Sequence, residues 1–263
     1  MKFLPGPSVV YPPSEQQKLA QLEALFREWH EHFAEHAPVE FRSLADELVF
    51  DGFYPHYFSQ KVRVLFIGRE CRDLAGCNYI ENLLTEYRGK QEIGTQHLNS
   101  SKFHSRMLRI AHGLQNGMIP WNAIPYASEI GRSFAMDAGL SFAFMNISKL
   151  SNGRKSWQSD WTSINTAHST STKNRSLNRE EIEILEPHLI VTMKLKEKVK
   201  SLGQLTPISS SKHARTYWLQ NGDRKSLLID TFHFSAPRKK AVEHYYTPIC
   251  EAIRSLGNSG WTA

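Results

Sequence analysis

Short apolar runs rich in β-branched residues alternate with polar and amphipathic segments along the chain. A run of this kind, bounded by polar or turn-forming residues, is typical of a strand buried on both faces of a parallel sheet. We predict four such strands, at Val62–Ile67, Ser141–Ile147, His188–Met193 and Ser226–Phe232. Because helix-like segments separate them, we expect an α/β fold in which a central four-stranded parallel sheet is flanked by helices on both faces.

Apolar residues at three- or four-residue spacing predict the helices of this fold. The first follows Ser14 and ends before Pro38. Later helices are expected at Leu74–Tyr87, Arg179–Leu185 with Asn178 as its cap, Leu195–Leu202 and Ala241–Leu256. Gln91–Ile130 is expected to be a polar and helical connection whose core-facing stripe consists of Phe103, Met107, Ile110 and Leu114.

Two features describe the organisation of the whole chain. Residues 1–60 are interpreted as an N-terminal arm and helical extension that packs on an α/β domain formed by residues 61–263. The polar segment Ser148–Arg175 is predicted to be a long loop. Loops of this length inside compact domains are usually functional or disordered, so we regard it as a candidate binding loop.

Composition narrows the class of partner. The 263 residues carry a net charge of +6 with a pI near 9.2, which suits a polyanion such as DNA. The three cysteines suggest neither a disulfide framework nor a metal site, so we expect no metal and no other cofactor. No apolar run is long enough to span a bilayer, and the first residues lack the apolar core of a signal peptide. We expect a cytoplasmic monomer with no membrane partner.

Three polar residues follow three of the predicted strands. Glu70 comes after the first strand, Asn146 lies near the end of the second, and His233 follows the fourth. In open α/β sheets, ligands bind beyond the carboxyl ends of the strands. A carboxylate there can activate water, an amide can read the edge of a base, and an imidazole can stabilise charge on a departing base. This combination predicts cleavage of a bond to a heterocyclic leaving group.

The order of four motifs resembles the uracil-DNA glycosylase superfamily over about residues 62–238. Gly68-Arg69-Glu70-Cys71-Arg72 looks like the family's strand-end motif, Gly-x-Asp/Asn-Pro or Gly-Glu-x-Pro-Gly. Phe144–Lys149 is similar to the central strand that carries a base-reading Asn followed by Lys. Glu181–Val191 resembles the segment Glu-Ile…Lys-Pro-x-Ile-Ile-Val, and Thr231–Ser235 resembles the closing loop Thr-Tyr-His-Pro-Ser. Cys71 and Phe234 replace prolines of the family.

The resemblance implies a role for each site residue. Glu70 would orient a water molecule and stabilise the cationic sugar, and His233 would hydrogen-bond the departing base. Asn146 would pair with the edge of a pyrimidine, and Tyr79 would stack on the extruded base. Gly68 and Arg72 complete the expected base-binding set, and the expected DNA-binding residues are Ser235, Arg238, Lys239, Lys149 and Arg154.

The position of Arg72 bears on the substrate. One branch of the family has a tyrosine there, which excludes bases substituted at C5. We therefore expect a monofunctional DNA glycosylase that removes a C5-substituted pyrimidine, with a role in anti-phage defence. The alternatives are a uracil-DNA glycosylase of base-excision repair, a non-catalytic DNA-binding member of the fold, and a hydrolase of free nucleotides.

Overall fold

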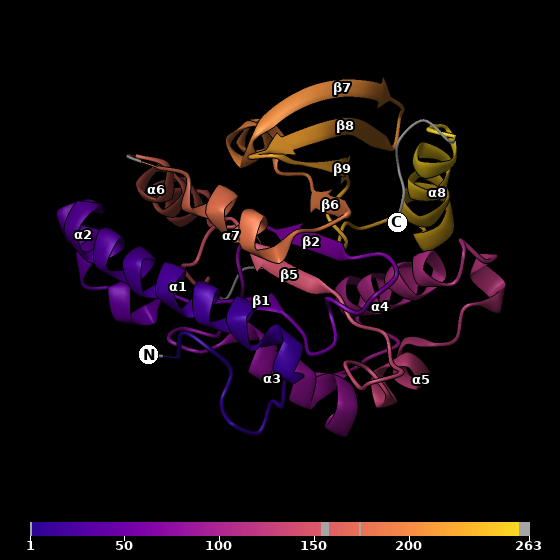
Figure 1. Cartoon of the computed structure of the whole chain (residues 1–263), viewed down its shortest axis with the longest axis horizontal. Helices are drawn as coiled ribbons and strands as arrows, with labels where there is room; N and C mark the ends of the chain where they lie inside the picture. Colours follow the sequence, from indigo (N-terminus) through magenta and orange to yellow (C-terminus); the bar gives the residue numbers. More distant parts are fainter. Residues whose placement is uncertain (1, 154–157, 174, 258–263) are drawn as a thin grey trace.

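The computed structural model describes residues 2–153, 158–173 and 175–257. Within these residues the main sheet has seven strands in the order β1-β5-β2-β6-β9-β8-β7 (Figure 1). The strands are β1 (Gly52–Phe53), β2 (Val64–Gly68), β5 (Ala143–Asn146), β6 (Leu189–Met193), β7 (Gln204–Ser210), β8 (Ala214–Asn221) and β9 (Arg224–Thr231). A separate two-stranded hairpin is formed by β3 (Glu92–Ile93) and β4 (Gln96–His97).

The four predicted strands correspond to β2, β5, β6 and β9, which are neighbours and run parallel. The prediction of a four-stranded sheet is nevertheless wrong, because antiparallel strands extend it at both edges. On one side β1 pairs with β5, and on the other β8 pairs with β9 and β7 pairs with β8. The fold is therefore α/β with a mixed sheet whose centre is parallel.

The strands β7 and β8 were missed because they produce no long apolar run. Most residues of β7 are exposed, and it contains Pro207, which is tolerated on an edge strand because no neighbour needs its missing N–H. Only alternate residues of β8 are deeply buried along much of its length. Strands at a sheet edge need not bury both faces, so the pattern that identifies the central strands is absent from them.

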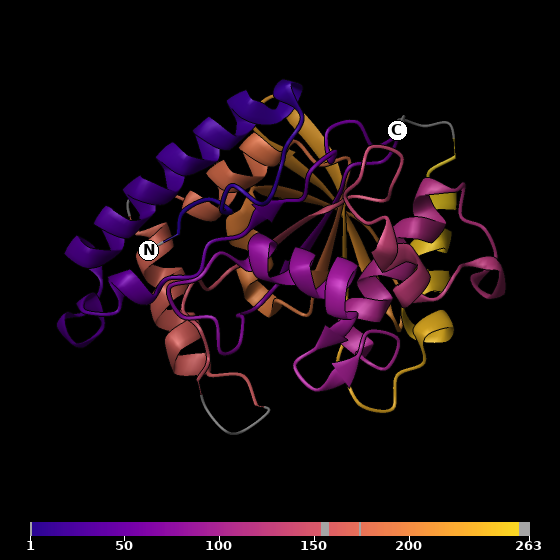
Figure 2. The ribbon, with the colours of Figure 1, turned by 90° about the horizontal axis from the view of Figure 1, so that it is seen from below.

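Helices cover both faces of the sheet (Figures 1 and 2). One face packs against α1 (Gln16–His36), α6 (Trp161–Thr172) and α7 (Leu177–Leu185), and the other against α3 (Tyr79–Thr85), α4 (Lys102–Gln115), α5 (Ala127–Arg132) and α8 (Thr247–Arg254). Alternate residues of β2 belong to the two separate cores: Phe66 to the α4 side, and Leu65 and Ile67 to the α1 side. Burial on both faces explains the continuous apolar run.

Shorter elements complete the chain. They are α2 (Val39–Arg42), the 3₁₀ helices η1 (Pro13–Glu15), η2 (Ala45–Glu47), η4 (Trp121–Ala123) and η5 (Lys196–Leu202), and the π-helical turns η3 (Glu86–Lys90) and η6 (Val242–Tyr246). The predicted basic helix after β6 is thus a 3₁₀ helix, and the predicted last helix is η6 followed by α8.

Two helix starts differ from the prediction. The helix expected from Leu74 begins only at Tyr79, because Asn78 caps it by accepting hydrogen bonds from the N–H groups of Ile80 and Glu81. Residues 69–77 therefore form an irregular loop after β2. For α7 the cap is Ser176, whose hydroxyl accepts from the Arg179 N–H.

The segment predicted as a long loop contains α6. Asp160 caps this helix, because its carboxylate accepts from the Ser163 N–H at 3.3 Å. The helix is rich in serine and threonine, which have low helix propensity, and this composition hid it. Arg154 lies in the part of this segment outside the described residues.

Residues 1–60 share their core with the central strands. Leu22, Phe26 and Trp29 of α1 are buried beneath the face of the sheet that carries Leu65 and Ile67. The short strand β1 also belongs to this segment and pairs with β5. The N-terminal segment is thus built into the sheet and its covering layer.

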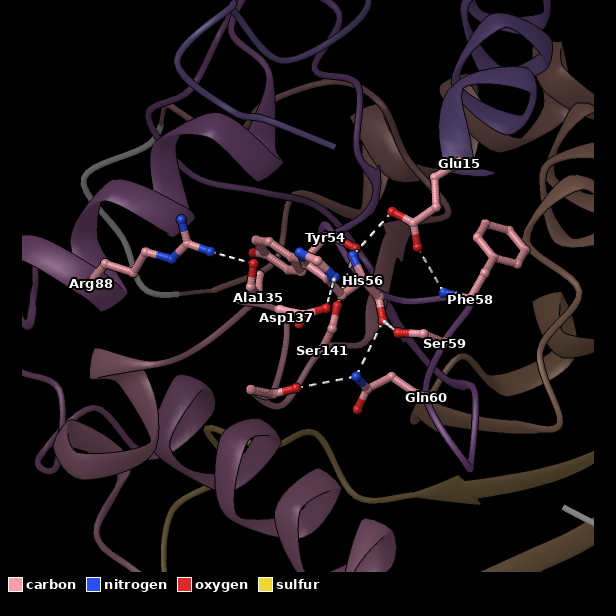
Figure 3. A network of polar contacts seen from close by, with 11 residues as sticks. Glu15, Tyr54, His56, Phe58, Ser59, Gln60, Arg88, Ala135, Asp137 and Ser141 are labelled. Carbon is pink, nitrogen blue, oxygen red and sulfur yellow. Dashed lines mark hydrogen bonds and ion pairs between the residues drawn. The ribbon is translucent and has the colours of Figure 1, made fainter. Parts of the chain in front are cut away.

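The buried carboxylate of Glu15 ties the start of α1 to the segment before β2 (Figure 3). It accepts hydrogen bonds from the backbone N–H groups of His56 and Phe58, at 3.0 and 2.9 Å. His56 has φ +65°, so this turn is held in a conformation that few non-glycine residues adopt. Gln60 donates to the His56 carbonyl within the same turn and to the Gly139 carbonyl, which ties the turn to the segment before β5 (Figure 3).

Across the described residues, no helix is both long enough and apolar enough to cross a lipid bilayer.

Candidate functional site

The carboxyl ends of the parallel strands bring the three predicted polar residues to one edge of the sheet. Gly68 at the end of β2 pairs with Asn146 at the end of β5. Glu70 and His233 each lie two residues beyond the last residue of their strands, β2 and β9. Only β6 separates β2 from β9, so these two strands are about 10 Å apart. The three residues therefore lie near one another along this edge of the sheet.

Asn146 points across the end of β2. A Cβ atom at Gly68 would overlap the Asn146 Oδ1 atom, so only glycine leaves room for this amide. The residue is buried, and its backbone N–H donates to Asp51 Oδ2 at 2.7 Å. Among the described residues, nothing hydrogen-bonds its Oδ1 atom. A buried amide oxygen without a partner is costly, and a ligand at this position would satisfy it.

His233 is a neutral hydrogen-bond donor. Its Nδ1 atom lies 3.3 Å from the Ser235 N–H and 2.7 Å from the Ser235 hydroxyl. Because a backbone N–H can only donate, Nδ1 is an acceptor, and the ring proton of the neutral imidazole is on Nε2. Burial, followed by the positive charge of Arg69, lowers the pKa of His233 to about 4. At neutral pH the site therefore offers an uncharged N–H donor.

The loop that carries His233 is fixed from behind by two side chains of the core. The Tyr245 hydroxyl donates to the His233 carbonyl at 2.8 Å. The buried guanidinium of Arg106 donates to the carbonyl groups of Phe234 and Lys239 and lies 4.5 Å from the Tyr245 ring centre. Arg106 was missed because its position in the apolar face of α4 gives no signal of a polar role. It holds the loop geometry on which His233 depends.

The two oxygens of the Glu70 carboxylate are not equivalent. Oε1 accepts from Asn152 Nδ2 at 3.0 Å and from the Asp160 N–H at 3.1 Å. Oε2 is buried and has no hydrogen-bond partner among the described residues. Burial raises the pKa of Glu70, against the effect of the two hydrogen bonds. The arrangement leaves Oε2 without a hydrogen bond among the described residues, on a carboxylate more basic than usual.

The start of α6 lies against the Glu70 carboxylate. Asp160 caps α6 and also donates its N–H to Glu70. The next residue, Trp161, has the Arg69 guanidinium carbon 5.1 Å and the Lys196 ammonium 4.2 Å from its ring centre. The segment expected to be a binding loop therefore contacts the Glu70 carboxylate through Asn152 and Asp160.

The aromatic residue beside His233 is Phe103, not Tyr79. Tyr79 is buried, and its ring is stacked on Phe144 at 4.4 Å with an interplanar angle of 16°. Phe103, at the start of α4, is only half-buried, with its ring 5.6 Å from His233 and 6.0 Å from Phe144. The predicted stacking of Tyr79 on a base would require this buried ring to leave Phe144 or to become exposed. Phe103, placed in a core stripe by its spacing, has the exposure that stacking on a base requires.

Arg72 lies within the same loop as Glu70. It forms a parallel β-bridge with Asn152, and its positive charge opposes the rise in the pKa of Glu70. The side chain is half-buried. A contact between Arg72 and a base stays a prediction.

Lys149 is buried, so it does not lie at the surface that its predicted contact with DNA requires. Its ammonium is buried, paired with Asp51, and 2.8 Å from Glu181 Oε2. It also lies 4.8 Å from the Trp29 ring centre. Burial, with a further contribution from Asp51, raises the pKa of Glu181 well above its usual range even though Lys149 opposes this. Because Asp51 also accepts from the Asn146 N–H, this buried triad of Lys149, Asp51 and Glu181 supports the end of β5.

The remaining predicted DNA-binding residues lie on the His233 loop. Ser235 and Arg238 are exposed, and Arg238 has φ +58°. The Lys239 ammonium lies 4.1 Å from the ring centre of Phe232. These three residues form a polar and basic surface next to His233.

Comparisons with known proteins assign no family. No protein-family model matches the chain, and no curated protein matches its sequence. Within the described residues, no three histidine, cysteine or carboxylate side chains form a group that could hold a metal ion. The chemistry of Glu70, Asn146 and His233 is therefore the basis for assigning a function.

Proposed function

We propose that this chain is a monofunctional DNA glycosylase related to the uracil-DNA glycosylase superfamily. It would flip a pyrimidine out of DNA and hydrolyse the bond between the base and the sugar. One observation supports this most strongly: an unpartnered carboxylate oxygen, an unpartnered amide oxygen and a neutral imidazole donor share one edge of the sheet. The parallel centre with helices on both faces is compatible with the three-layer fold of that superfamily.

Each group has a role in hydrolysis. Glu70 Oε2 holds a water molecule against C1′ of the sugar, and its charge stabilises the positive charge that develops there. The bond from C1′ to the base breaks, and its electron pair leaves with the base. His233 Nε2–H hydrogen-bonds the oxygen on which negative charge accumulates. The water oxygen bonds to C1′, and its proton passes to Glu70, whose raised pKa favours that transfer.

Recognition of the base is assigned to Asn146. A carboxamide carries one acceptor and two donors, which match the edge of a pyrimidine. Since the described residues leave Oδ1 unpaired, pairing with a base completes the hydrogen bonding of this buried group. Phe103 would stack on the flipped ring next to His233.

The preferred base is proposed to be a pyrimidine with a polar C5 substituent. The resemblance places Arg72 where a tyrosine blocks such substituents in one branch of the superfamily. A guanidinium has five donors in a fixed plane and can bind hydroxyl-rich groups. Bulky modified cytosines of phage genomes carry such groups, so we propose a role in defence against phage DNA. Uracil removal in repair is the competing assignment.

The direct test is the release of free base. The purified chain is incubated with matched duplexes that contain uracil, cytosine or 5-hydroxymethylcytosine, and with modified phage DNA, and free bases are identified by mass spectrometry. We expect a free modified pyrimidine from the wild type and at least ~10²-fold slower release by Glu70→Gln. The control Glu35→Gln makes the same change at an exposed carboxylate near the far end of α1 and should leave the rate unchanged.

Other outcomes overturn the proposal in distinguishable ways. Binding of DNA without release of base from any substrate would identify a non-catalytic DNA-binding protein. Hydrolysis of free nucleotides, with DNA left intact, would identify a nucleotide hydrolase.

A further inference from the structure

The turn between β7 and β8 lies beside the His233 loop. Ala214, the first residue of β8, pairs with Thr231, the last residue of β9. The residues that precede Ala214 therefore lie next to those that follow Thr231. The turn thus adds residues next to the candidate site. The sequence did not predict them there, because neither β7 nor β8 was expected.

Basic side chains from three elements surround the Phe232 ring. The ring centre of His213, from the turn, is 6.0 Å away, and that of His244, from η6, is 6.3 Å away. The two imidazoles contact each other edge to face at 4.8 Å. Lys239, from the His233 loop, places its ammonium 4.1 Å from the same ring. We call these residues, together with the exposed Lys212, the Phe232 cluster.

The Phe232 cluster has an excess of positive charge and an incomplete set of hydrogen bonds. Slight burial and the nearby His244, Lys212 and Lys239 lower the pKa of His213, with Glu243 opposing them. The Glu243 carboxylate lies 3.2 Å from the Lys240 ammonium and 3.9 Å from His244 Nε2, so it faces two basic groups at once. The Nδ1 atom of His213 is buried and has no partner among the described residues. An anion at this position would neutralise the lysines and accept a hydrogen bond from a protonated His213.

We propose that the Phe232 cluster binds a phosphodiester of the DNA strand and takes up a proton as it does so. This proposal rests on the proposed function, since it assumes that DNA is the ligand. Ser235 and Arg238 on the adjoining loop would contact phosphates near the flipped nucleotide, and the cluster continues this surface towards the β7–β8 turn. In the free protein the lysines favour neutral His213. A bound phosphate reverses that electrostatic balance, so protonation and binding favour each other.

The first test measures affinity against pH. The full chain is titrated with a duplex that contains a tetrahydrofuran abasic analogue, which cannot be cleaved, from pH 5.5 to 8.5 at constant ionic strength. A rise of about one unit in the pKa of one imidazole on binding corresponds to a tenfold gain in affinity. We expect tightening on the order of tenfold between pH 8 and pH 6 in the wild type. His213→Gln and His213→Asn should lose most of that gain.

A matched control is available at the other end of the molecule. His32 and His36 form a second pair of contacting imidazoles, 4.3 Å apart, near the end of α1. This end of α1 lies far from α8 and η6 (Figure 1). His36→Gln should keep the full pH dependence. Identical pH profiles for the wild type and both His213 variants would overturn the proposal.

The second test measures affinity against salt and does not depend on titration. Lys212→Ala should reduce the slope of log affinity against log salt by about 0.9, the value for one phosphate contact. Lys225→Ala removes an exposed lysine at the opposite end of β9 and should leave the slope unchanged. An unchanged slope for Lys212→Ala also counts against the cluster. If the pH profile or the salt slope is unchanged but the wild type still releases free base, the Phe232 cluster is excluded and the proposed function stands. If the wild type does not bind DNA, both the cluster and the proposed function are overturned.

Discussion

Gly68→Ala tests whether Asn146 reads the base. The added methyl group would occupy the space of the Asn146 Oδ1 atom and would also approach Phe144 at 3.1 Å. Gly68 is hydrogen-bonded within the centre of the sheet, so the backbone cannot move away easily. We expect the amide of Asn146 to rotate out of its position instead.

The expected decrease in kcat/KM of Gly68→Ala follows from the hydrogen bonds that Asn146 would lose. A bidentate pair between an amide and a base edge contributes about 1–3 kcal/mol of discrimination. Its loss corresponds to a decrease of about 5- to 150-fold in kcat/KM for the preferred base. Overpacking also costs about 1–3 kcal/mol of stability, so the assay temperature must lie well below the Tm of the variant.

The assay compares single-turnover cleavage of the preferred base and of a second pyrimidine. Gly68→Ala should slow the preferred base more than the second one, since reading of the base edge is lost. Gly89→Ala is the control, because no atom lies within 4 Å of the position of its added Cβ. Equal rates and unaltered discrimination in a folded Gly68→Ala protein would refute the role of Asn146.

Four other changes test individual groups. Glu70→Gln removes the charge but keeps the size of the side chain, so cleavage should fall at least ~10²-fold while DNA affinity is held; unchanged cleavage excludes Glu70 from the chemistry. Activity should fall as the pH decreases through the pKa of Glu70, which burial raises above 4.5. Asn152→Ala deletes a hydrogen bond that lowers this pKa, so the acid limb of the pH–rate profile should move to higher pH. His233 stays neutral above about pH 4, so His233→Asn should lower the rate but leave that limb in place. Arg72→Ala should narrow the rate difference between a base with a polar C5 group and uracil; faster removal of uracil by the wild type would show that Arg72 does not contact the base.

The centre of the sheet could be predicted from the sequence because burial on both faces leaves a direct signal. Residues 64–67 of β2 and 189–191 of β6 are apolar at consecutive positions, and each strand is covered by both cores. The edge strands β7 and β8 and the helix α6 carry no comparable signal. Their positions depend on pairing and capping with residues that become neighbours only in the folded chain.

For the site, the sequence located the groups at strand ends but not the residues that orient them. Glu70, Asn146 and His233 follow from the rule that ligands bind at the carboxyl edge of parallel strands. Asn152 and Arg106 act through hydrogen bonds to residues 82 and 128 or more positions away, and sequence spacing does not reveal such contacts.

Distant contacts also explain why Lys149 was expected at the surface although it is buried. A lysine after a strand end is usually solvated, and here two distant carboxylates instead make its burial possible. The error arose because both partners, Asp51 and Glu181, belong to other segments of the chain.

The buried triad of Lys149, Asp51 and Glu181 has a consequence for how this sequence can diverge. Removing one member of a buried ion pair leaves an uncompensated charge and costs about 3–5 kcal/mol, whereas replacing the whole group by apolar residues can be neutral. Because the raised pKa of Glu181 keeps it protonated at neutral pH, this cost applies to the charged pair, and loss of either Lys149 or Asp51 alone is opposed by the other. Among descendants of a common ancestor, we expect Lys149 and Asp51 to be retained together or lost together. Such joint variation would mark distant relatives of this chain even where overall sequence similarity has disappeared.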